Sequence, residues 1–162
     1  MHCKTQCVDV MHDLCGVDMR EHNLYGDIFV FMNIMLLICG LIQKWINWEF
    51  FVQYALILIF LHSVRGMMAF VTTCKANCNV KQSPWSSRSE NEVWFMISGH
   101  TLNTLIITGL ILNSNFPVFI KYLSVSISVM VCFFQTATRE HYTSDIFITA
   151  CLVFLSTRTF IR

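Results

Sequence analysis

Five long apolar runs, separated by polar stretches, dominate the chain after residue 27. A helix needs about 20 mostly apolar residues to cross the hydrocarbon core of a bilayer. The runs therefore predict an all-α, polytopic transmembrane helix bundle with about five spans. These spans are expected at residues 28–42, 50–64, 93–112, 116–134 and 142–160.

The remaining residues predict a simple domain organisation. Residues 1–27 are polar and carry seven charges, so they predict a polar N-terminal segment rather than the apolar core of a signal peptide. Residues 28–162 are expected to form one membrane-embedded catalytic domain. The only long connection between spans runs over residues 72–92.

Composition supports a membrane protein and excludes one class of partner. Of the 162 residues, 55% are hydrophobic and only 13% are charged, whereas soluble domains have about a quarter charged. The net charge is +1 and no block of basic residues occurs, so nucleic acid is not an expected partner. The expected surroundings are a lipid bilayer.

The order of the spans predicts which polar residues meet. With five spans, the third and the fifth both begin on the side of the membrane that holds the N-terminus. His100 lies in the third span, and His141 and Asp145 lie at the start of the fifth. All three are therefore expected at one membrane face. The distribution of Lys and Arg between the two sides does not decide which face this is.

Ionisable groups at membrane depth are costly, by about 2.5–3.5 kcal/mol on insertion scales, and indicate function. His141 and Asp145 are four residues apart, which places them on one face if the segment is helical. The carboxylate then fixes one ring nitrogen and leaves the other as a nucleophile or base. His100 is expected to supply the opposite proton transfer.

An anion site completes the predicted chemistry. Arg65 and Arg139 are expected to bind phosphate, since arginine matches phosphate with paired hydrogen bonds. Ser98 and Gly99 are expected to bring a hydroxyl and a backbone without a Cβ close to this anion. Together with the two histidines, these residues predict phosphoryl transfer through a phosphohistidine, without a metal.

Simpler interpretations exist for each feature. A His-x-x-x-Asp spacing is common by chance, and His100 is also interpretable as a hydrogen bond between helices. Both histidines with Asp145 are an alternative metal site. The cysteines among residues 1–27 are open to interpretation as a zinc site or as disulfide partners of the 74–78 segment.

Two motifs resemble those of a known family. Ser98-Gly99-His100-Thr101 resembles the Ser-Gly-His-Thr motif of sphingomyelin synthases and inositol phosphorylceramide synthases. The segment from His141 to Asp145 resembles their His-Tyr-Thr-x-Asp motif. Ser156–Phe160 is similar to the Thr-Thr-Arg-x-Phe that closes the same family helix, and Arg65-Gly66 is similar to an Arg-Gly in an earlier one. These enzymes belong to the phosphatidic acid phosphatase type 2 superfamily.

The resemblance implies a sphingomyelin synthase-like phosphotransferase that moves a phosphocholine-like head group from a phospholipid to ceramide or diacylglycerol. It implies His141 as nucleophile, Asp145 as its partner and His100 as acid, with Tyr142 at the substrate and no cofactor. A multi-pass protein of the Golgi, endoplasmic reticulum or plasma membrane is expected, if the source is eukaryotic, with a lumenal or exoplasmic site. A lipid phosphatase and an inactive lipid-binding relative are the alternatives, and homo-oligomerisation is left open.

Two features depart from the family pattern. Family members usually have six spans rather than five, and the Cys-Gly-Asp that usually precedes Ser-Gly-His is absent. The choice between a lipid acceptor and water depends on how deeply the site is buried. His100 is expected about seven residues inside the third span, roughly 10 Å along a helix. Such a depth shields a phosphohistidine from water and favours transfer to a lipid.

Overall fold

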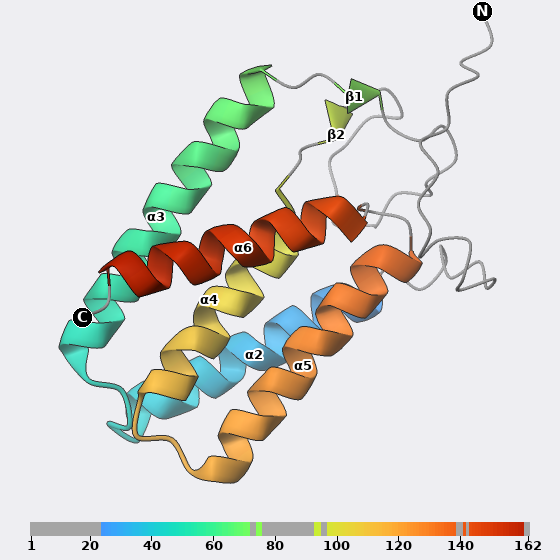
Figure 1. Ribbon diagram of the computed structural model, residues 1–162. Coiled ribbons are helices and arrows are strands. Elements are labelled where there is room, and N and C mark those ends of the chain that lie inside the picture. Colours follow the sequence, from blue (N-terminus) through green and yellow to red (C-terminus); the bar gives the residue numbers. More distant parts are fainter. Residues whose placement is uncertain are drawn as a thin grey trace, which may run out of the picture.

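The chain forms an all-α bundle, which confirms the predicted fold class (Figure 1). The computed structural model describes residues 24–71, 74–75, 93–94, 97–138, 141 and 143–160. Within them lie the helices α2 (Leu24–Ile42), α3 (Trp48–Val71), α4 (Gly99–Asn113), α5 (Val118–Ala137) and α6 (Thr143–Phe160). The two-residue strands β1 (Cys74–Lys75) and β2 (Val93–Trp94) pair antiparallel. Most of the expected N-terminal segment and of the 72–92 connection lies outside the described residues.

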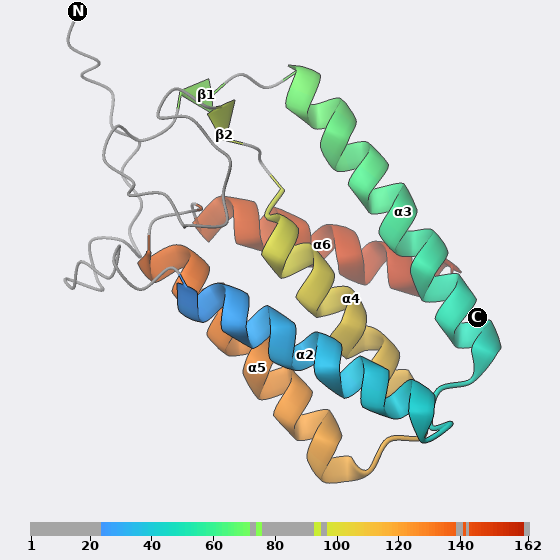
Figure 2. The same ribbon diagram turned by 180° about the vertical axis from the view of Figure 1, so that it is seen from behind.

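Helix α4 is the centre of the bundle. It packs against each of the other four described helices, and Figures 1 and 2 show it enclosed by them. Its 15 residues correspond to about 22 Å at 1.5 Å per residue, which is shorter than the ~30 Å hydrocarbon core. A short apolar helix of this kind is stabilised by its neighbours on all sides rather than by contact with lipid.

The start of α4 differs from the expected span. The sequence places this span at 93–112, but Val93 and Trp94 pair with β1, and the helix begins only at Gly99. Ser98 has an extended backbone and caps the helix, because its Oγ accepts a hydrogen bond from Thr101 N at 3.3 Å. His100 is consequently the second residue of α4, and the expected depth of seven residues is wrong.

Two connections hold the opposite end of the bundle together. Helix α2 ends in a Schellman motif, in which Trp45 N donates to Gly40 O at 2.9 Å and Lys44 N donates to Leu41 O at 3.2 Å. Lys44 takes the left-handed conformation that this motif requires, with φ of 56°. Asn115 N then donates to Trp45 O at 2.9 Å, which ties the α4–α5 connection to the α2–α3 turn.

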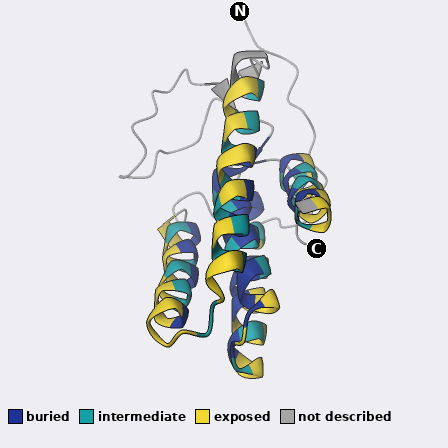
Figure 3. Cartoon of the chain, turned by 90° about the vertical axis from the view of Figure 1, so that its left-hand side faces the viewer, coloured by how far each residue is buried: buried dark blue, intermediate teal, exposed yellow. Residues whose placement is uncertain are grey.

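The outer faces of the helices are apolar, as a bilayer requires. Phe31, Met67, Phe119 and Phe147 are each more than 60% exposed, and the exposed residues lie on outward-facing sides (Figure 3). Three described stretches are long and apolar enough to cross a membrane, namely Leu24–Ile42, Trp48–Met68 and Val118–Ala137. The chain is therefore a membrane protein. Helices α4 and α6 do not meet the same criterion within the described residues.

A buried polar cluster joins α2, α4 and α5 halfway along the bundle. Asn33 Nδ2 donates to Thr108 Oγ1 at 3.0 Å, and Ser124 Oγ donates to Asn33 Oδ1 at 2.7 Å. Thr108 Oγ1 also lies 2.6 Å from Ser128 Oγ. These side chains are at most 6% exposed, so their polar atoms depend on one another rather than on water. The cluster fixes how the three helices pack.

Candidate active site

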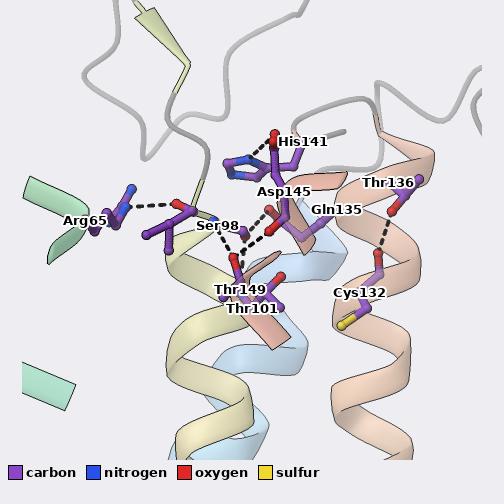
Figure 4. A network of polar contacts seen from close by, with 10 residues as sticks. Arg65, Ser98, Thr101, Cys132, Gln135, Thr136, His141, Asp145 and Thr149 are labelled. Atoms are coloured by element: carbon purple, nitrogen blue, oxygen red, sulfur yellow. Dashed lines mark hydrogen bonds and ion pairs between the residues drawn. The ribbon is translucent and has the colours of Figure 1, made fainter. Parts of the chain in front are cut away.

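The residues just before α4 bring the ends of three helices together. Ser98 N donates to Thr149 Oγ1 of α6 at 3.1 Å, and Thr149 Oγ1 donates to Asp145 O at 2.6 Å. Ser98 Oγ contacts Gln135 Oε1 of α5 at 3.5 Å. Figure 4 shows these contacts as one network below His141 and Asp145. The expected convergence of the third and fifth spans at one end of the bundle is therefore present.

His141 and Asp145 form a buried pair at this end. The His141 Nδ1 and Asp145 Oδ2 atoms are 3.6 Å apart, which is an ion-pair distance rather than a hydrogen bond, and the side chains are 4% and 10% exposed. His141 precedes α6 and is not helical, contrary to the expected shared helix face. Its position is set by its backbone N–H, which donates to Gln135 O at 3.2 Å.

Helix polarity suits Asp145 to this position. Asp145 lies in the first turn of α6, where the positive end of the helix dipole favours a negative charge. The carboxylate also faces Nδ1 of His141, so the opposite ring nitrogen, Nε2, is the one directed away from this pair. A carboxylate this close to a histidine ring stabilises positive charge on the ring.

His100 has a partner that the sequence analysis missed. Its Nε2 lies 2.7 Å from Asp27 Oδ1, and the two side chains are 38% and 32% exposed. Asp27 is in the first turn of α2, at the same end of the bundle. The signal was present in the sequence, because the first and third spans were expected to start on the same side, with Asp27 bordering the first. The bond engages Nε2 of the His100 ring, and Nδ1 is the other ring nitrogen.

Arg65 reaches the start of α4 from α3, as Figure 4 shows. Its Nε donates to Ile97 O at 3.1 Å. A Cβ on Gly99 would lie only 2.7 Å from Arg65 Nη1 and 3.0 Å from its Cζ. The missing side chain of Gly99 thus makes room for the guanidinium. The sequence expected this glycine beside a bound anion, whereas in the structure it is Arg65 that occupies the space.

Of the other residues predicted to bind the anion, the structure describes only Ser98. Ser98 is fully buried, and its hydroxyl caps α4 and contacts α5 rather than pointing to an open space. Arg139 and Tyr142 lie outside the described residues, so their predicted roles stay predictions. The cysteines of residues 1–27 lie outside them as well.

The alternative metal site is not assembled. In the part of the chain that the structure describes, no three His, Cys, Asp or Glu side chains lie close enough together to hold a metal ion. The candidate residues at this end of the bundle are instead two histidines, each beside one carboxylate, and an arginine. Such a set offers a nucleophile, a second base or acid, and a cation for phosphate.

Comparison with known proteins identifies the region that carries this site. No curated protein and no solved structure showed significant similarity to the chain. Residues 95–161 match the family described as "PAP2 superfamily C-terminal", and these residues include both histidines and Asp145. The part of the chain from just before α4 to the end of α6 is thus similar to the C-terminal region of the PAP2 superfamily.

Proposed function

We propose that this protein is a membrane phosphotransferase that moves the head group of a phospholipid to a second lipid alcohol through a phosphohistidine on His141. The observation that carries this proposal is the buried His141–Asp145 pair beside the start of α4. Superfamily similarity over residues 95–161 fits a lipid phosphatase or phosphotransferase. The resemblance of the two motifs to sphingomyelin synthases favours ceramide or diacylglycerol as the acceptor.

The first chemical step makes one bond to phosphorus and breaks another. Nε2 of His141 attacks the phosphorus of the donor, because Nδ1 is turned towards Asp145. The bond between phosphorus and the glyceryl oxygen breaks, and that oxygen takes a proton from His100. The Asp145 carboxylate stabilises the positive charge that develops on the ring of His141. Diacylglycerol leaves.

The second step reverses these movements. The acceptor hydroxyl gives its proton to His100, its oxygen bonds to phosphorus, and the bond between nitrogen and phosphorus breaks. Asp27 holds His100 by Nε2, so that Nδ1 exchanges the proton in both steps. Arg65 offers its cation to the negative charge on the phosphoryl oxygens.

A lipid phosphatase is the second candidate, and one observation favours it. His100 is the second residue of α4 and its side chain is 38% exposed, so the depth that favoured shielding from water is absent. Water can therefore reach the residue that would take a proton from the second nucleophile, so water can replace a lipid alcohol in the second step. An inactive lipid-binding relative is disfavoured because both histidines and both carboxylates are present.

One experiment distinguishes these candidates. The full chain is reconstituted in vesicles with a head-group-labelled phospholipid, with and without ceramide, and all products are measured by mass spectrometry. We expect labelled sphingolipid only when ceramide is present. Equal release of water-soluble label in both cases, with no new lipid, would show that water is the acceptor and would refute the transferase; release of inorganic phosphate from labelled phosphatidic acid would then establish the phosphatase.

Matched histidine variants test the nucleophile in the same assay. His141→Ala should abolish all turnover of the donor, since no attacking nitrogen remains. His62→Ala is the control, because His62 is on α3 and its Nδ1–H donates to Leu58 O at 3.0 Å. We expect His62→Ala to turn over the donor at the wild-type rate. Full activity of His141→Ala would refute the phosphohistidine and with it both enzyme candidates.

Side and compartment follow from the same proposal. The site lies at the end of the bundle where α2, α4 and α6 begin. By resemblance to the eukaryotic enzymes, we place this end in the lumen or outside the cell, which puts the end of α6 in the cytosol. Labelling of an engineered exposed cysteine in intact vesicles measures this orientation.

A further inference from the structure

A cavity lies at the end of the bundle opposite to His141. It has a volume of about 470 Å³, within the range of about 300–1,000 Å³ that is typical of small-molecule sites. It opens between α3, α4 and α6, near the point where α6 ends beside the first half of α3 (Figures 1 and 2). It does not touch the candidate active site.

The lining of this cavity has two chemically different parts. Leu105, Leu112 and Val153 supply an apolar wall. Arg158 and Asn113 supply polar groups where α6 and α4 end. A lining that is apolar along one wall and polar at one end suits an amphiphile better than a soluble ion.

Arg158 is held at the rim of the cavity. Its Cζ lies 5.4 Å from the centre of the Phe154 ring, which is within the range of a cation–π contact. Among the described residues, no carboxylate lies within ion-pair distance of Arg158, and no acidic side chain lines the cavity. The positive charge is therefore not neutralised by the described part of the protein.

The cavity lining also contains hydrogen-bond donors that suit an anionic group. Asn113 Nδ2 donates to the Tyr54 hydroxyl oxygen at 2.9 Å. Because this hydroxyl accepts from Asn113, its own hydrogen is left to donate to a second partner. Tyr54 is 2% exposed, so its phenol is held in place. A guanidinium and a phenol hydroxyl in one cavity match phosphate oxygens.

We propose that this cavity binds a membrane phospholipid with a net negative charge, with its phosphate on Arg158 and its acyl chains along Leu105, Leu112 and Val153. A zwitterionic phospholipid fits less well, because the described lining has no carboxylate for its ammonium group. This site is separate from the proposed reaction and does not depend on it. The cavity lies at the membrane face opposite to His141.

The test compares two phospholipids of identical acyl chains, phosphatidylglycerol and phosphatidylcholine. Binding to the purified full chain is measured by native mass spectrometry at equal concentrations. We expect phosphatidylglycerol to be retained at least about fivefold more, which is the effect of one basic residue near a membrane surface. Equal retention of the two lipids by the wild-type protein would overturn the proposal.

Three variants locate the binding. Arg158→Gln should reduce the preference to about one, and Ala150→Leu should do the same by filling the cavity without changing the charge. Lys121→Gln is the control, because Lys121 lies at the same end of the bundle and donates to Leu112 O from outside the cavity lining. We expect it to keep the wild-type preference. Equal losses in Lys121→Gln and Arg158→Gln, or an unchanged preference in Ala150→Leu, would indicate diffuse surface charge and refute the site.

Photocrosslinking of a lipid to the wild-type chain tests the site without any substitution. Phosphatidylglycerol with a photoreactive acyl chain should crosslink to peptides that contain Leu105 or Val153. Unlabelled phosphatidylglycerol should compete for these crosslinks at lower concentrations than phosphatidylcholine does. Crosslinks spread evenly over the exposed apolar helix faces, with equal competition by both lipids, would contradict a defined site.

Discussion

The contact between Gly99 and Arg65 yields a prediction with a magnitude from the structure. In Gly99→Ala, the new Cβ would lie 2.7 Å from Arg65 Nη1, whereas ordinary contacts are 3.4–4 Å. The guanidinium must therefore move by about 1 Å, and its hydrogen bond to Ile97 O is strained or lost. A displacement of about 1 Å in a group that positions substrate costs about 10²-fold in rate.

Stability should change much less than the rate. The Arg65 side chain is long, so it can move without displacing backbone, and a lost hydrogen bond costs only about 0.5–1.5 kcal/mol net. We therefore expect Gly99→Ala to fold, with an unfolding free energy within about 1.5 kcal/mol of wild type, while kcat/KM falls by about 10²-fold. Donor turnover in vesicles and unfolding in detergent measure the two quantities separately.

Gly66, which follows Arg65 in the chain, provides a matched control. A Cβ on Gly66 would meet nothing within 4 Å, and Gly66 is exposed in the interior of α3. Gly66→Ala should leave turnover unchanged and stabilise the helix by about 0.5–1 kcal/mol. Wild-type turnover in Gly99→Ala would show that the position of Arg65 does not matter for the reaction. A loss of similar size in Gly66→Ala would show that the effect is not specific to this contact.

Substitutions at four further positions test the site and the fold. Asp145→Asn should retain the fold and lower turnover by about 10⁴-fold, the size of the analogous change in a serine protease triad; turnover within tenfold of wild type would exclude the pair. Asp27→Asn should lower kcat by up to about 10²-fold without changing KM, and Asp27→Glu should recover part of it, whereas a purely structural role predicts no recovery. Asn33→Val should lower the unfolding free energy by about 1–3 kcal/mol because it removes the buried hydrogen bonds of Asn33 with Thr108 and Ser124, with unchanged turnover per folded molecule; unchanged stability would show that these bonds are dispensable. Gly40→Ala should destabilise by about 1–3 kcal/mol, because the added Cβ would lie 2.6 Å from Phe116 Cε1 in a packed cluster; wild-type stability would show that the ring moves aside freely.

The sequence by itself determined the fold class and the residues that carry the candidate chemistry. Long apolar runs favour burial in lipid, where each backbone must satisfy its own hydrogen bonds. A helix does so within one segment, so these runs predict membrane helices. The alternation of spans across the membrane then decides which span ends share a face. For this reason the sequence places His100, His141 and Asp145 at one end of the bundle, and the structure brings the segments that hold them together.

Tertiary structure decided how these residues are held. Hydropathy does not separate a helix from an apolar strand or loop, so the start of α4 at Gly99 depends on the Ser98 cap and on the pairing of β1 with β2. Likewise, His141 meets Asp145 although it lies outside the helix, because its backbone is bonded to α5.

Local sequence patterns also do not predict contacts between residues of distant segments. Asp27 is 73 residues from His100, and Arg65 is 32 residues from the carbonyl of Ile97 that it binds. The order of the spans places Asp27 and His100 on the same side, but local spacing does not predict either contact, since both form only when separate helices pack. The cavity at Arg158 has the same origin, because its walls come from three helices whose ends meet only in the folded bundle.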